Sequence, residues 1–115
     1  MTVATLSPDE YPEEGQQFFS DFEKKYGDKT PDPYAIYGYE TMALALASLK
    51  AVGDKANDRE AVRAQLLENT KDRQSALGVY SIDENGDTTL TDYGLYTIKD
   101  GLPTFDKVIK AQASN

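Results

Sequence analysis

Three tyrosines, Tyr34, Tyr37 and Tyr39, stand close together at the start of the most apolar part of the sequence, PDPYAIYGYETMALALASLK (residues 31–50). Only three positions in this stretch carry a charge: Asp32, Glu40 and Lys50. Because residues three apart share one side of a helix, Tyr34 and Tyr37 would present two rings together. Paired rings can line a ligand site, but Tyr also commonly buries its ring and keeps its hydroxyl in water. Both interpretations, ligand binding and packing, are open at this point.

The residue types behind most enzyme chemistry are missing. The chain has no Cys and no His, so it has no thiolate nucleophile, no imidazole base and no zinc site of the common types. Its adjacent carboxylates, such as Glu13 and Glu14, fall at an expected helix start, where they stay solvated and suit the helix dipole. Glycine-rich phosphate loops and the G-x-S-x-G motif are also lacking. We therefore expect no enzyme, no catalytic residue and no cofactor.

One acidic segment superficially resembles a calcium loop, the sequence DENGD at residues 83–87. An EF-hand loop needs Gly at its sixth position and Glu at its twelfth, which here are Thr88 and Gly94. A hairpin turn explains the same letters, so no metal site is expected.

The charge balance limits the class of partner. Twenty acidic residues against twelve basic ones give a net charge of −8, which repels nucleic acids and anionic lipid surfaces. No apolar run reaches the ~20 residues that span a bilayer, and no signal-peptide pattern follows Met1. We expect one soluble domain over residues 1–115, without a targeting signal in this chain.

The first third of the chain predicts a strand and a helix. Residues 2–6, TVATL, suit a short strand. A helix is expected from about Pro12, a residue favoured in the first turn, to Gly27, a frequent helix stop. Its aromatic residues fall on one side and should pack against another element: Phe18, Phe19, Phe22 and Tyr26.

The tyrosine-rich stretch predicts a second helix, capped by Asp32, opened by Pro33 and closed by Gly53. One arc of this helix carries large apolar residues: Tyr39, Met42, Leu46 and Leu49. A neighbouring arc is built mostly of smaller ones: Tyr34, Tyr37, Gly38, Thr41, Ala45, Ser48 and Val52. The rest, with Glu40, Ala43, Ala47 and Lys50, is expected to face water. Such a helix should be central and enclosed on two flanks.

The remainder predicts one more helix and a β-meander. A helix over residues 58–69 would begin with a capping box formed by Asn57 and Glu60. Strands are expected at residues 77–83, 93–101 and 103–109, because Asn85–Gly86 and Asp100–Gly101 are strong signals for type I′ turns. Residues 111–115 are expected to be a frayed end. The isolated chain is thus an α+β protein of three helices followed by a meander.

Four segments in this order resemble the C-terminal portion of type I periplasmic solute-binding proteins, the branched-chain amino acid binding family of ABC transporters. They are GQQFFSDFEKKYG, PYAIYGYETMALAL, DREAVRAQLL and LGVYSIDENGDTTLTDYGLYTIKDG. The resemblance covers essentially the whole chain. It implies an α/β fold of two lobes, of which this chain is a C-terminal fragment.

The resemblance also implies a function. Family members hold a small solute between the lobes by hinge closure and deliver it to a membrane permease, in the periplasm or outside the cell, some as lipoproteins. The start of the long helix lines their cleft, so Tyr34 and, secondarily, Tyr37 would contact an amino-acid-like ligand. The other ligand-clamping segments have no counterpart here, and this chain alone should bind weakly or not at all.

A different class of function is also open, a small self-associating α+β interaction module without a ligand. Exposed apolar patches beyond a few hundred Å² seldom remain uncovered. A homo-oligomer is therefore expected under either interpretation.

Overall fold

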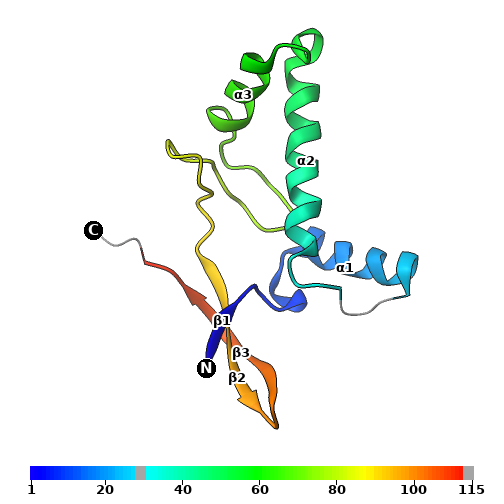
Figure 1. The fold of residues 1–115 in the computed structure, drawn as a ribbon, viewed down its shortest axis with the longest axis vertical. Coiled ribbons are helices and arrows are strands. Elements are labelled where there is room, and N and C mark those ends of the chain that lie inside the picture. The colour runs from blue at the N-terminus through cyan, green and yellow to red at the C-terminus, as the bar shows by residue number, and fades with distance from the viewer. Residues whose placement is uncertain (28–30, 113–115) are drawn as a thin grey trace.

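The computed structural model describes residues 1–27 and 31–112 (Figure 1). The elements are β1 (Thr2–Ala4), α1 (Glu13–Tyr26), α2 (Ala35–Val52), α3 (Arg59–Leu67), β2 (Asp92–Lys99) and β3 (Leu102–Lys110), with short 3₁₀ turns at Pro8–Glu10 and Gly53–Lys55. In Figure 1, α3 lies beside the C-terminal half of α2, and α1 crosses the N-terminal end of α2. The sheet lies below α1 in this view. The expected three helices and antiparallel strands are confirmed.

The sheet differs from the predicted meander in the origin of its third strand. Its order is β1-β2-β3, all antiparallel, so the N-terminal strand pairs with β2 and places Val3 opposite Leu95. Residues 77–83 form no strand and make only the isolated pairs Arg73–Tyr80 and Ile82–Thr88. Residues 77–83 were expected to pair with the strand that follows them. They instead run past α2, and a side-chain contact between Tyr80 and Glu40 holds them there.

The two predicted hairpin turns have different outcomes. Asp100 and Gly101 both have positive φ, 53° and 82°, and connect β2 to β3 as a type I′ turn requires. At Asn85–Gly86 only Gly86 has positive φ, so the type I′ prediction is wrong there. Asp83 organises that turn instead, because its carboxylate accepts the backbone N–H groups of Asn85 and Asp87, both at 2.9 Å.

The helix ends follow local chemistry closely. Gly27 adopts the left-handed conformation and donates its N–H to Glu23 O, ending α1 as predicted. The helix α2 begins at Ala35, two residues later than expected, after Asp32 Oδ1 has accepted the N–H of Tyr34. For α3 the predicted Asn57 cap is wrong: Asp58 is the N-cap and accepts from the N–H groups of Glu60 and Ala61.

A small core lies where α1, α2 and the 70–82 segment meet. Tyr11, Ile36 and Ala76 form its centre, and Ile36 is completely buried. Partly buried residues pack around this centre: Leu6, Phe18, Phe19, Tyr37 and Leu77. The aromatic face of α1 therefore packs as expected, except at Tyr26, which is largely exposed. In the part of the chain that the structure describes, no helix is long and apolar enough to cross a membrane.

Gly15 allows α1 to approach this core. A Cβ at this position would overlap Ala76 O and would lie 2.6 Å from the Cβ of Tyr11. Gly15→Ala should therefore lower the free energy of unfolding by about 1–3 kcal/mol, the cost of overpacking. The matched control is Gly38→Ala in α2, where an added Cβ meets nothing within 4 Å; Gly38→Ala should raise stability by about 0.5–1 kcal/mol through helix propensity. Urea unfolding of both variants measures the difference, and equal effects would contradict this packing.

The long helix is not enclosed on two flanks, so that prediction is wrong for this chain. Its large-residue arc is open to solvent, with exposed fractions of 52% for Tyr39, 60% for Met42, 58% for Leu46 and 39% for Leu49. The chain as a whole exposes 8314 Å², whereas a compact monomer of this mass exposes about 6,200 Å². Its radius of gyration is 16.5 Å, against about 13 Å for a compact domain of this length. The chain leaves apolar surface that it does not itself cover.

Candidate functional site

A groove lies between the N-terminal segment, the start of α2 and the strand approach at residues 88–93. We call it the tyrosine groove; its volume is about 630 Å³. Its lining consists of residues 3–6, 10–12, 34, 37, 77–79, 88–93 and 110. The structure thus brings both predicted site residues, Tyr34 and Tyr37, into one groove.

The two rings occupy different depths. Tyr34 is 68% exposed, whereas Tyr37 is half-buried and packs against the core. Their centroids are 6.0 Å apart and the planes are tilted by 42°. Tyr37 therefore packs against the core and also lines the groove, while Tyr34 lines the groove with most of its surface exposed.

A third tyrosine, Tyr11, lines the same groove and was not predicted. It is 3% exposed, and its Oη has no hydrogen-bond partner among the described residues. A buried hydroxyl without a partner costs about 1–3 kcal/mol. Burial, followed by the neighbouring Tyr37 hydroxyl, raises the pKa of Tyr11, so the group is a neutral donor and acceptor at physiological pH. It is the one unsatisfied buried side-chain polar atom in the described chain.

The rim of the tyrosine groove carries both signs of charge. Glu10 and Asp92 supply carboxylates, and Lys110 supplies an ammonium group. Lys110 Nζ lies 3.7 Å from Asp92 Oδ1, with both side chains well exposed, so this pair is weak and open to exchange of partners. Threonine hydroxyls add neutral donors and acceptors along the wall: Thr5, Thr88, Thr89 and Thr91.

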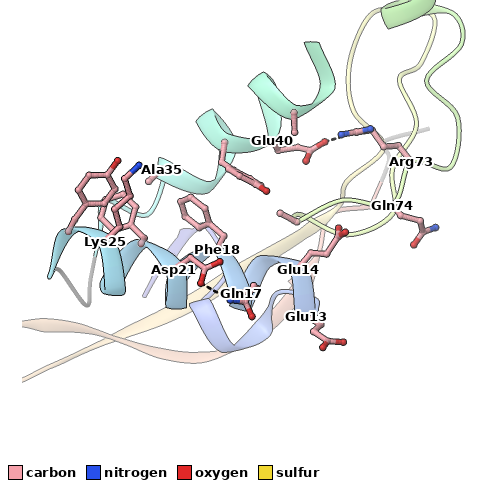
Figure 2. Close-up of a pocket in the computed structure, with 15 residues that line it drawn as sticks. Glu13, Glu14, Gln17, Phe18, Asp21, Lys25, Ala35, Glu40, Arg73 and Gln74 are labelled. Atoms are coloured by element: carbon pink, nitrogen blue, oxygen red, sulfur yellow. Dashed lines mark hydrogen bonds and ion pairs between the residues drawn. The ribbon is translucent and has the colours of Figure 1, made fainter. Parts of the chain in front are cut away.

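A second groove lies between α1, α2 and residues 73–76. We call it the helix groove; its volume is about 780 Å³. Figure 2 shows Phe18 on its inner side and the acids Glu13, Glu14 and Asp21 along α1. Asp21 already accepts from Gln17 at 2.7 Å and pairs with Lys24 at 3.3 Å. The helix groove is therefore an apolar furrow with a solvated acidic edge.

At the end of the helix groove, Glu40 binds two partners from the 70–82 segment. Its Oε1 accepts from Arg73 Nε at 2.7 Å and from Tyr80 Oη at 2.9 Å (Figure 2 shows the arginine pair). Glu40 is only 4% exposed, so the prediction that it faces water is wrong. The reason is the charge on Arg73, which makes the burial of this carboxylate tolerable. Glu40 thus fastens the irregular segment to α2.

The stability of this contact should depend on pH. Burial, and then the hydrogen bond to Glu40, raises the pKa of Tyr80 from 10.0 to about 12. Above pH 10 the unfolded chain loses this proton before the folded chain does, so stability should fall between pH 10 and about 12. Tyr80→Phe should flatten part of this decline, whereas Tyr93→Phe, on an exposed residue, should leave it unchanged. If wild type and Tyr80→Phe had identical unfolding midpoints across this pH range, the loss of stability could not be assigned to Tyr80.

The DENGD segment uses its oxygens internally. Asp83 accepts from the backbone of its own turn, and these hydrogen bonds, first that of Asp87 and then that of Asn85, lower the pKa of Asp83. Among the residues that the structure describes, no three His, Cys, Asp or Glu side chains gather as they would around a metal ion.

Sequence reasoning missed the contribution of residues far from the tyrosines. Tyr11 and the 88–93 segment reach the groove only because β1 pairs with β2, a contact between the two ends of the chain. The sequence did contain a signal for Glu40, because a single acidic residue within an apolar helix indicates a buried ion-pair partner as readily as a solvent-exposed position.

Comparisons with known proteins agree with one another. A family model described as "Periplasmic binding protein" matches residues 1–102. A solved structure described as the leucine-binding protein LivK from Thermotoga maritima superposes with a TM-score of 0.77 at 25% sequence identity. The match covers 94% of this chain and 30% of the LivK chain, so this chain spans less than a third of that protein. No curated protein matches.

Proposed function

Because the chain belongs to the periplasmic binding protein family, we propose that it supplies one wall of a solute-binding cleft, at the tyrosine groove, and that the solute is an amino acid or a related small polar compound. The coarser role, solute binding, follows from the family itself. The finer assignment to this groove is our proposal, and the LivK likeness supports an amino acid as the ligand class.

One observation carries the proposal: the rings of Tyr34 and Tyr37 line one groove together with the charged side chains of Glu10, Asp92 and Lys110. Binding sites combine apolar and aromatic walls with a few polar groups that fix orientation.

The rim charges fit a zwitterion. An amino acid carries a carboxylate and an ammonium group, and the rim offers Lys110 for the first and Glu10 or Asp92 for the second. The exposed aromatic face of Tyr34 would then contact the side chain of the ligand. Because this chain spans 30% of LivK, these groups form one side of a site rather than a full enclosure.

The wider context of the proposal is an ABC transporter. We infer that the longer protein closes around its ligand by a hinge motion, in the periplasm or outside the cell, and passes the ligand to a membrane permease. Closure of this kind is a population shift toward a state whose extra contacts exist only when the ligand is bound. No enzyme activity is proposed, since the chain has no His and no Cys.

Nuclear magnetic resonance titration of the chain with leucine, and then with other amino acids, tests the proposal. We expect weak binding, with a dissociation constant of the order of millimolar, because the site is one-sided. Tyr34→Ala should weaken binding about tenfold, a loss of about 1.4 kcal/mol that suits one aromatic contact. Tyr26→Ala is the matched control, since Tyr26 is comparably exposed but lines the helix groove. Equal effects of the two substitutions would refute the assignment to the tyrosine groove.

A second candidate function has its own support, a self-associating interaction module. The exposed area exceeds that of a compact monomer by about 2,000 Å², and a standard interface removes about 800 Å² from each partner. Homo-oligomer formation is therefore proposed alongside solute binding, on independent grounds.

A further inference from the structure

Residues 73–80 form a loop whose two ends converge on one carboxylate. The backbones of Arg73 and Tyr80 pair with each other, with N–O distances of 2.7 and 3.1 Å. The side chains of the same two residues both donate to Glu40 Oε1, at 2.7 and 2.9 Å. Glu40 of α2 therefore holds both ends of the loop through a single oxygen atom. We call these three residues the Glu40 latch, and residues 73–80 the latch loop.

The tip of the latch loop is shaped by its own hydrogen bonds. Ser75 Oγ donates to Gly78 O at 2.7 Å and accepts the backbone N–H of Leu77 at 3.1 Å. The N–H of Gly78 in turn donates to Ser75 O at 3.1 Å. Gly78 has a φ of 114°, a conformation that residues with a side chain rarely adopt. Because these bonds make the tip compact, a displacement of the loop ends also displaces the tip.

The tip of the latch loop is part of the wall of the tyrosine groove. Residues 77–79 line this groove, and the three latch residues are not among the described residues that line it. Leu77 packs against the same core as Tyr37. Tyr37 and Glu40 lie three residues apart in α2, so they share one side of the helix. The latch thus connects the side of α2 that carries a groove ring to the loop that completes the wall.

The contacts of the latch are buried within this chain. Glu40 is 4% exposed and Tyr80 is 3% exposed. Ala76, in the middle of the loop, is also buried, with its carbonyl oxygen close to Gly15 of α1. Hydrogen bonds to a charged group are stronger in such a dry site than on the surface. The position of the loop is therefore set by contacts that this chain makes itself, whatever other segments pack around it.

We propose that the Glu40 latch positions the tyrosine groove: it holds residues 77–79 in place in the groove wall, and so raises affinity for the solute without touching it. The inference rests on the proposed function of this groove. A preformed wall binds better than a mobile one, because a mobile wall loses freedom when the ligand binds. Loss of the latch should therefore weaken binding although every lining residue is retained.

Hydrogen exchange of the backbone amides in the ligand-free chain tests the positioning. Glu40→Ala should speed exchange at Leu77 and Gly78 at least about tenfold, because the loop then opens without global unfolding. Tyr80→Phe, which removes one hydrogen bond and no charge, should speed it about threefold. The matched control is Asp58→Ala, which removes the N-cap of α3, a helix that lines neither groove. If Asp58→Ala speeds these amides as much as Glu40→Ala does, or if the two latch variants leave them unchanged, the positioning is overturned.

Titration with leucine, followed by nuclear magnetic resonance, tests the effect on affinity. Glu40→Ala should raise the dissociation constant about five- to tenfold. Glu40→Gln, whose side-chain oxygen can still accept both hydrogen bonds, should restore most of the affinity. Asp58→Ala should bind as wild type does, which separates positioning from a general loss of stability. Equal dissociation constants for wild type and Glu40→Ala would overturn the proposal.

The two measurements also separate the latch from the function on which it rests. Leucine-induced shifts confined to the helix groove would contradict the proposed function and not the positioning of residues 77–79. The exchange measurement needs no ligand, so it decides the positioning even where leucine produces no shift.

Discussion

Arg73→Met is expected to lower the free energy of unfolding by about 3 kcal/mol, since it leaves the Glu40 carboxylate buried without its counter-charge. Arg73 Nε lies 2.7 Å from Glu40 Oε1, and the two side chains are 23% and 5% exposed. Methionine retains much of the arginine stem, so the loss reports the charge rather than the packing. Urea unfolding measures it through the midpoint at constant slope.

The control for this substitution is Arg63→Met on α3. Arg63 pairs with Glu60 at 2.7 Å, a distance equal to that of the buried pair, but on the surface. Its loss should lower stability far less than the loss of the buried pair, because water screens an exposed ion pair. Combining Glu40→Gln with Arg73→Met should recover part of the stability, because no unpaired charge remains. If Arg73→Met cost no more than Arg63→Met, Glu40 would not fasten the 70–82 segment in the way described.

Ile36→Ala is expected to cost about 3 kcal/mol, since Ile36 is completely buried at the centre of the core and a smaller residue leaves a cavity. Thermal or urea unfolding measures the loss. The matched control is Ile98→Ala in β2, where the same side chain is 57% exposed and should cost about 1 kcal/mol or less. Similar losses for both would mean that the small core does not carry the stability of the chain.

Local signals predicted local structure well. The Gly27 stop of α1 and the Asp100–Gly101 turn follow from backbone conformations that glycine and its neighbours favour, and both were confirmed. The cap of α3 was misplaced by one residue, because Asn57 and Asp58 are both good caps and only the geometry chooses between them. The resemblance to periplasmic binding proteins and the α/β fold class that it implies were also confirmed.

Contacts between distant segments could not be predicted in the same way. The pairing of β1 with β2 joins the two ends of the chain, and Arg73 and Tyr80 reach Glu40 across more than thirty residues. A helical wheel assigned α2 two buried arcs from composition alone. It could not show that the large-residue arc would lack a neighbour, because exposure depends on what the rest of the protein supplies.

The candidate site shows the same division. Tyr34 and Tyr37 were predicted through the family resemblance, and the structure places both in the tyrosine groove. Their assignment as ligand-binding residues remains a prediction. Tyr11 and the charged rim became visible only once the fold had brought residues 10–12 and 88–93 beside them.

The most direct test of the solute-binding account is a map of the backbone amide shifts that leucine induces in the isotope-labelled chain. We predict that the amides that shift cluster around the tyrosine groove, at Tyr11, Tyr34, Tyr37 and residues 88–92, and that the amides of the helix groove, from Glu13 to Lys25, stay in place. Shifts confined to the helix groove would contradict it.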